Sequence, residues 1–142
     1  MIIRNVAKSV VLNPAGEVLL LRRSMTDPRR PGEWDFPGGG VEDGESHAEG
    51  AARELEEEAG IRVLPTNLRL LYTKTQVYES ENQSINRSLF AVRVGEAAAH
   101  DVQLSFEHDL AKWLPVDEAL EAFPHPFYGA GLRYALEHNL LP

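Results

Sequence analysis

The sequence contains no cysteine, which excludes disulfides, thiolate metal sites and cysteine nucleophiles. It also lacks any apolar run of about eighteen residues, so no segment is predicted to span a membrane. Positive charge is scarce: 14 Lys and Arg stand against 22 Asp and Glu, a formal net charge of −8. This balance argues against binding to a nucleic-acid polymer, which normally requires a basic surface. It does not argue against a small nucleotide, whose charge metal ions can neutralise.

Length and composition predict one globular domain. The 142 residues are 43% hydrophobic and 25% charged, which suits a single domain over residues 1–142 with a substantial core. The first 13 residues alternate in polarity, and no small-residue cleavage site of a signal peptide follows them. We therefore expect a cytoplasmic protein. The sequence leaves open whether it is a monomer or a homodimer.

Alternating and β-branched segments predict a sheet. Strands are predicted over residues 6–13, 17–22, 34–37, 61–64, 68–78 and 85–94, and a further strand ends at 112–115. Polar loops are predicted at 24–33, 79–83 and 95–103, with a proline-rich turn at 123–127. Two late helices are predicted at 118–122, capped by Asp117, and at about 129–138. This order predicts an α/β fold in which helices pack on a mixed β-sheet.

The centre of the chain predicts a helix with an acidic face. Ser46 and Glu49 have the spacing of a capping box, and Gly60 stands where a left-handed residue would end the helix. Three carboxylates at i, i+3 and i+4 share one face of this helix: Glu54, Glu57 and Glu58. Residues 39–61 contain no lysine to offset their repulsion. A hard divalent cation such as Mg²⁺ would convert the repulsion into coordination.

This stretch resembles a known signature. Residues 39–61 match the Nudix hydrolase pattern G-x5-E-x7-R-E-U-x-E-E-x-G-U, in which U is aliphatic. A chance match is on the order of 10⁻⁹ per starting position, from ordinary residue frequencies. The resemblance implies a Nudix-type α/β/α sandwich, a mixed sheet with helices on both faces. It also implies Mg²⁺-dependent hydrolysis, with Mn²⁺ as a possible substitute, of a nucleoside diphosphate linked to another moiety by water attack on phosphorus.

The resemblance also implies roles for individual residues. The metal ligands are expected to be three helix carboxylates and one glycine carbonyl: Glu54, Glu57, Glu58 and Gly38. Arg53 is expected to orient these carboxylates and the preceding loop. Glu45 is expected to hold that loop to the helix. Gly39 and Gly60 are expected to have structural roles in the backbone of the signature. The catalytic set implied in this way is Arg53, Glu54, Glu57 and Glu107.

The general base is not fixed by the signature. Glu107 lies six residues before Trp113, as does the base of the Nudix branch that destroys oxidised guanine nucleotides. A plain surface acid is the alternative reading of Glu107. Glu54 is the next candidate for the base, and His108 is another.

Substrate contacts are expected outside the signature, from residues 24–33 and 123–127. The candidate substrate-binding residues are Arg23, Asp35, Phe36, Tyr78 and Phe127. Trp34, Phe127 and Tyr128 offer ring faces for stacking on a base. A nucleoside triphosphate or related nucleotide is the first substrate class. A diadenosine polyphosphate or a nucleotide sugar remains an alternative, as does a catalytically silent Nudix-like domain that senses a ligand.

Overall fold

The computed structural model describes residues 1–123 and 125–142. The strands are β1 (Ile2–Leu12), β2 (Val18–Arg23), β3 (Trp34–Asp35), β4 (Gly38–Gly40), β5 (Arg69–Tyr78), β6 (Gln83–Arg93) and β7 (His108–Leu114). The helices are α1 (His47–Ala59), α2 (Glu96–His100), α3 (Val116–Ala122) and α4 (Pro126–Glu137), with short 3₁₀ turns η1 (Pro65–Asn67) and η2 (Glu79–Glu81). Among the described residues, no helix is both long and apolar enough to cross a membrane.

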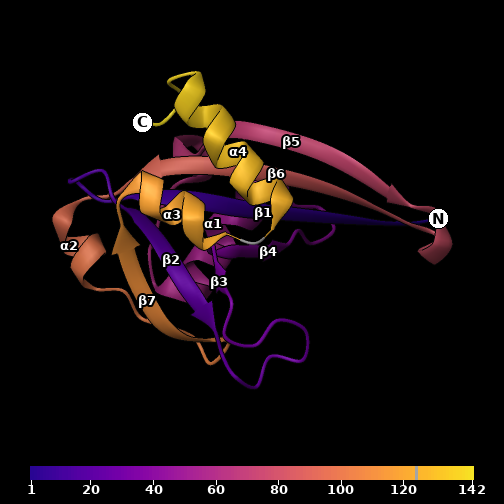
Figure 1. The fold of residues 1–142 in the computed structure, drawn as a ribbon, viewed down its shortest axis with the longest axis horizontal. Helices are drawn as coiled ribbons and strands as arrows, with labels where there is room; N and C mark the ends of the chain where they lie inside the picture. Colours follow the sequence, from indigo (N-terminus) through magenta and orange to yellow (C-terminus); the bar gives the residue numbers. More distant parts are fainter. Residues whose placement is uncertain (124) are drawn as a thin grey trace.

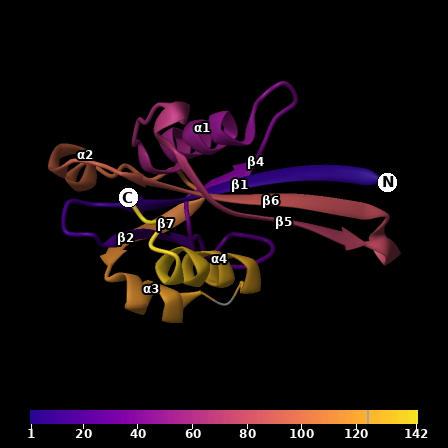
Figure 2. The same cartoon turned by 90° about the horizontal axis from the view of Figure 1, so that it is seen from above.

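The strands form one mixed sheet with helices on both faces. The main order is β3-β2-β1-β6-β5, while β4 pairs with β1 and β7 pairs with β2. Strands β1 and β6 are parallel, and the other pairs are antiparallel. Helix α1 covers one face, and α3 and α4 cover the other (Figures 1 and 2). The predicted α/β/α sandwich is confirmed.

Two core layers follow from the alternation of side chains along the strands. In β2, Val18 and Leu20 pack against the layer beneath α3 and α4, whereas Leu19 and Leu21 pack against the layer beneath α1. Successive strand residues point to opposite faces, so a strand covered on both sides reads as a continuous apolar run. All four residues are fully buried.

Helix α1 begins and ends as predicted. Ser46 accepts a hydrogen bond from the backbone of Glu49, and the Glu49 side chain returns one to the backbone of Ser46. Gly60 ends the helix in the left-handed region at φ 70°, where glycine is favoured because it has no Cβ. The small residues Ala51 and Ala59 are buried with Leu55 in the core layer beneath α1.

Two predictions between the strands were wrong. Residues 61–64 form no strand: Ile61 is buried in the core layer beneath α1, Leu64 is 64% exposed, and Pro65 begins η1. A proline cannot donate to a ladder, so the chain turns there. The predicted loop at 95–103 contains α2, whose sequence EAAAH has high helix propensity.

The two C-terminal helices begin earlier than predicted. Helix α3 starts at Val116 after Pro115, and Asp117 lies within it and does not cap it. Helix α4 starts at Pro126, because the His125 side chain accepts a hydrogen bond from the Phe127 amide and proline is favoured in the first helical turn. Within the predicted turn at 123–127, position 124 lies outside the described residues.

Candidate active site

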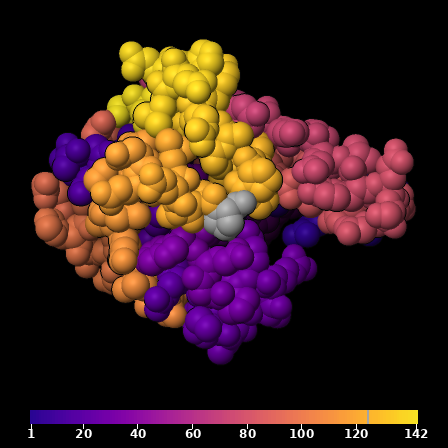
Figure 3. All heavy atoms as spheres, in the orientation of Figure 1, coloured from indigo at the N-terminus to yellow at the C-terminus, as the bar shows by residue number. Residues whose placement is uncertain are grey.

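A cavity of about 570 Å³ lies beside the acidic face of α1. It is lined by Arg4, Val6, Lys8, Arg23, Arg29, Arg30, Gly38, Gly39, Gly40, Glu54, Glu57, Glu58, Ile85, Arg87, Glu107, His125 and Tyr128. Figure 3 shows the surface notched between the loop after β2 and the projecting β5–β6 end, with β1 atoms at the back of the notch. A smaller cavity of about 370 Å³ adjoins it and shares Arg23, Arg29 and Glu107 with it.

Glu58 is the buried carboxylate of the site. It is 5% exposed, and its Oε1 accepts a hydrogen bond of 2.8 Å from the Gly38 amide. A side chain at position 38 is excluded, since a Cβ there would lie 2.3 Å from the Ala7 carbonyl oxygen. The pKa of Glu58 is raised to about 8: burial is the largest cause, the charge of Lys8 and the Gly38 hydrogen bond oppose it, and neighbouring Glu54 and Glu107 add to it.

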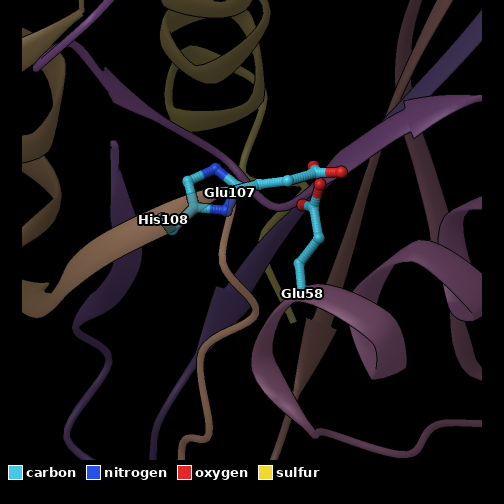
Figure 4. Close-up of side chains that lie close together, drawn as sticks. All are labelled: Glu58, Glu107 and His108. Atoms are coloured by element: carbon cyan, nitrogen blue, oxygen red, sulfur yellow. The ribbon is translucent and has the colours of Figure 1, made fainter. Parts of the chain in front are cut away.

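Glu107 and His108 meet Glu58 from the start of β7. One carboxylate oxygen of each glutamate and one ring nitrogen of His108 lie within 4.8 Å of one another (Figure 4). Glu107 is exposed, whereas His108 is 6% exposed and its Nδ1 has no hydrogen-bond partner among the described residues. Burial lowers the pKa of His108, so its imidazole is neutral near pH 7.

Arg53 ties the glycine-rich loop to the helix. Its Nε and Nη2 donate to the two carboxylate oxygens of Glu45 at 2.8 and 2.9 Å, and Nη2 also donates to the Gly40 carbonyl at 2.9 Å. The hydrogen bonds from Arg53 lower the pKa of Glu45 to about 2. Arg53 and Glu45 therefore make the contacts that their proposed positioning roles require. These partners hold Arg53 against the loop.

Glu54 and Glu57 also contact Arg53. Its Nη1 donates to Glu54 at 3.2 Å and to Glu57 at 3.3 Å. The Glu54 carboxylate packs so closely on the backbone that a Cβ at Gly39 would lie 3.0 Å from it, and burial raises the pKa of Glu54. Glu57 is exposed. All three predicted carboxylates line one cavity, but Glu58 forms the tightest group, with Glu107 and His108.

Asp35 and Arg23 belong to a buried ion network at the cavity wall. Asp35 is 2% exposed, and its Oδ2 lies 2.7 Å from Lys8 Nζ and 3.0 Å from Arg23 Nη1. Burial is the largest single effect and opposes ionisation of this aspartate, but the charge and hydrogen bond of Lys8, together with the charges of Arg30 and Arg23, outweigh it and lower the pKa of Asp35. Arg23 makes two further hydrogen bonds to Asp27. The network positions Arg23 and Lys8 at the cavity, and Asp35 itself does not line it.

Three candidate substrate residues lie elsewhere. Phe36 is fully buried and stacks on Phe123 at a centroid distance of 4.1 Å. Phe127 is 6% exposed and packs on Tyr72 in the core layer beneath α4, so its ring face is covered. Tyr78 lies at the end of β5, where its hydroxyl accepts a hydrogen bond from Arg87. None of the three lines the cavity described above. Tyr128 does line it, but it is 2% exposed and packs on Phe36, Phe127 and His125, so little of its ring face is free for stacking.

Several cavity cations come from outside the segments predicted to contact substrate. Arg4, Lys8 and Arg87 line the cavity, together with Arg29 and Arg30 of the predicted segment 24–33. Arg4 and Arg87 come together because β1 and β6 are parallel neighbours in register, a pairing that no local pattern reveals. Lys8 carried a signal: it is a charged residue within the apolar run of β1, where a buried ion requires a partner.

The donors of this cavity fit a divalent cation. Carboxylate oxygens of Glu58 and Glu107 converge with a neutral imidazole, and Glu54 and the Gly38–Gly40 backbone border the same space. Clustered carboxylates suit Mg²⁺ and Mn²⁺, and imidazole suits the later first-row metals. The raised pKa of Glu58 reflects a buried carboxylate whose ionised form a bound cation would stabilise.

Comparison with known proteins identifies the family. The chain matches the NUDIX domain over residues 3–133. It belongs to the Nudix family. The structure resembles that of a MutT protein from Methanosarcina mazei with a TM-score of 0.78 and 28% identity, covering 96% of each chain. It also resembles an Ap4A hydrolase of Caenorhabditis elegans with a TM-score of 0.70 and 28% identity, covering 96% of this chain and 97% of that one. Nudix proteins generally use a divalent metal.

Curated Nudix relatives differ in how much of their length is matched. A bis(5'-nucleosyl)-tetraphosphatase (asymmetrical) of C. elegans is 30% identical over 82% of this chain and 80% of its own length. A Myxococcus xanthus protein named octanoyltransferase is 41% identical over 78% of this chain, but over only 30% of its own length. An uncharacterised Nudix hydrolase of Pseudomonas aeruginosa is 50% identical over 37% of this chain and 32% of its length. The chain thus spans about a third of the length of these last two relatives.

Proposed function

We propose that this Nudix protein is a Mg²⁺-dependent pyrophosphohydrolase that cleaves a nucleoside diphosphate linked to another moiety. The observation that carries the proposal is a single cavity lined both by clustered carboxylates, of which Glu58 is buried, and by several cations. The acidic side holds Glu54, Glu57, Glu58 and Glu107, and the basic side holds Arg4, Lys8, Arg23, Arg29, Arg30 and Arg87. This division supports a substrate that carries phosphates, even though the chain is acidic overall.

Each side of the cavity has a separate task. The arginine side binds phosphate oxygens, for which a planar guanidinium with several donors is suited. The carboxylate side holds the cation, which neutralises the diphosphate and favours attack by water when bound. Glu54, Glu57 and Glu58 provide the carboxylate ligands, with the Gly38 carbonyl and one oxygen of Glu107 next to them. Arg53 and Glu45 fix the loop and the helix that present these groups.

Glu107 is our candidate for the general base. It is exposed at the cavity, near Glu58, so water can reach it. In the proposed reaction the water oxygen attacks phosphorus, the water proton passes to the base, and the bond to the bridging oxygen breaks. Glu54 is the alternative base, because it lines the same cavity and burial raises its pKa.

The substrate proposed first is a nucleoside triphosphate or related nucleotide. A diadenosine polyphosphate is the second candidate, supported by the similarity to the tetraphosphatase of C. elegans over most of both chains. The basic side extends from Arg4 on β1 to Arg29 and Arg30 in the loop after β2. Such a spread of cations suits a phosphate chain longer than a diphosphate. A nucleotide sugar would leave part of it unused.

A substrate panel tests the proposal. Normal and oxidised dGTP, a diadenosine polyphosphate, ADP-ribose and a nucleotide sugar are incubated with the enzyme in Mg²⁺, and in EDTA as a control. Products are resolved by anion-exchange chromatography, and the reaction in H₂¹⁸O places the label on the attacked phosphorus. We expect Mg²⁺-dependent release of a phosphate or pyrophosphate product. Binding of these compounds without turnover would instead favour a ligand-sensing Nudix domain.

A further inference from the structure

His108 is the first residue of β7, and the exposed Glu107 lies in the turn just before it. Glu107 therefore lies outside the regular alternation of side chains along the strand. Both residues offer a ligand atom within 4.8 Å of Glu58. The β2–β7 register shifts between Arg22 and Arg23, which pair with Leu110 and His108. A bulge of this kind redirects side chains and is common next to functional sites.

The environment of His108 leaves a nitrogen without a protein partner. Only 6% of the His108 surface is exposed, and its Nδ1 has no hydrogen-bond partner among residues 1–123 and 125–142. Buried polar atoms are nearly always paired, so such an exception requires an explanation. In Figure 4 the imidazole lies beside the carboxylates of Glu58 and Glu107. A metal ion held by those carboxylates would be within reach of the ring.

We propose that Glu58, Glu107 and His108 form a mixed oxygen–nitrogen metal position, and that His108 makes it favour first-row transition-metal dications over Mg²⁺. The inference deepens the proposed function and rests on its divalent-metal dependence. Imidazole is a good ligand for Co²⁺, Ni²⁺ and Zn²⁺, whereas Mg²⁺ takes oxygen ligands almost entirely. The carboxylates alone would accept either kind of ion, so the nitrogen decides the preference.

The spacing of the three groups is compatible with one ion. Two ligands bound at roughly 2.0–2.2 Å to the same metal lie at most about 4.4 Å apart. The three ligand atoms are within 4.8 Å of one another, so small side-chain rotations complete the site. His125 also lines the cavity but is not one of the three. It therefore provides a matched histidine control.

Electron spin-echo envelope modulation of bound Mn²⁺ tests the inference without measuring activity. A directly coordinated imidazole gives ¹⁴N modulation. This modulation changes when the unaltered protein is produced with ¹⁵N-labelled histidine. We expect nitrogen modulation in the unaltered protein and in His125→Gln, and its loss in His108→Gln. Calorimetric Co²⁺ and Mg²⁺ titrations should also show the Co²⁺-to-Mg²⁺ affinity ratio falling at least about tenfold in His108→Gln, as even outer-shell losses cost that much.

The outcomes separate this inference from the proposed function. Mn²⁺ bound without histidine modulation overturns the nitrogen ligand but leaves Mg²⁺-dependent hydrolysis standing, since the carboxylates suffice for it. Modulation that persists in His108→Gln, or disappears in His125→Gln, also overturns it. Should His108→Gln fail to fold, the isotope comparison on the unaltered protein decides whether any histidine binds. Single replacement of the other four histidines, each retaining the modulation, then assigns it to His108.

Discussion

Removing the charge of Glu58 should stabilise the metal-free protein. The pKa of this carboxyl is about 8 in the folded chain, against an ordinary value of 4.5, with burial as the main cause. The folded state therefore binds a proton that the unfolded state releases between pH 4.5 and 8, and stability falls as pH rises through this window. Glu58→Gln keeps an acceptor for the Gly38 amide but has no such dependence.

The size of the effect follows from the same pKa. At about 1.4 kcal/mol per pH unit, the ionised carboxylate costs at most about 5 kcal/mol above pH 8, and structural relaxation reduces this to about 2–3 kcal/mol. Urea unfolding in EDTA at pH 8 should show Glu58→Gln more stable than the unaltered protein by that amount. At pH 4.5 the two should differ little. Equal or lower stability of Glu58→Gln at pH 8 would refute the view that Glu58 is a strained, buried anion.

Three further predictions concern the base, the substrate range and a second titrating group. Glu107→Gln should lower kcat by about 10²–10⁴ with little change in KM if Glu107 is the base; retained activity would direct attention to Glu54. Because the described residues that line the cavity include no Asn or Gln amide to read a base edge, kcat/KM values across the nucleotide panel should lie within roughly a hundredfold, and a preference above about a thousandfold would reveal a missed specific contact. The pKa of His125 is lowered to about 4, by burial first and then by Arg87 and Arg30. At this residue the unfolded chain thus binds more protons than the folded chain between pH 6.5 and 4, so the contribution of His125 to the unfolding free energy should decrease as pH falls through this window; the unaltered protein should lose stability relative to His125→Asn as pH falls, and a constant difference between the two would contradict this reading.

Helix ends could be predicted from the sequence where the capping residues lie close together in the chain. The ends of α1 follow from Ser46, Glu49 and Gly60, whose capping contacts form within a few residues of chain. The start of α4 was missed because its cap is a histidine, His125, which is not a usual N-cap residue. The strand predicted at 61–64 was wrong because its apolar residues are used in loop packing, which propensity does not distinguish from a strand.

The acidic residues of the site could be predicted from the sequence, whereas Arg4 and Arg87 could not. Glu54, Glu57 and Glu58 share a helix face by their spacing alone. Arg4 and Arg87 lie at the cavity only through the parallel pairing of β1 with β6. Phe127 was predicted to contact substrate, but α4 turns its ring into the core. Long-range contacts of this kind carry no signature in a single sequence.

The most direct test of a metal-dependent site on α1 is turnover of matched glutamate variants at saturating Mg²⁺. Glu57→Gln and Glu58→Gln remove cavity carboxylates, whereas Glu56→Gln removes one on the same helix that pairs with Arg62 outside the cavity. On the best substrate of the panel, we expect kcat to fall at least about a hundredfold in the first two, more than an outer-shell partner typically costs, and to stay near normal in Glu56→Gln. Near-normal turnover in Glu57→Gln and Glu58→Gln would contradict the proposed site.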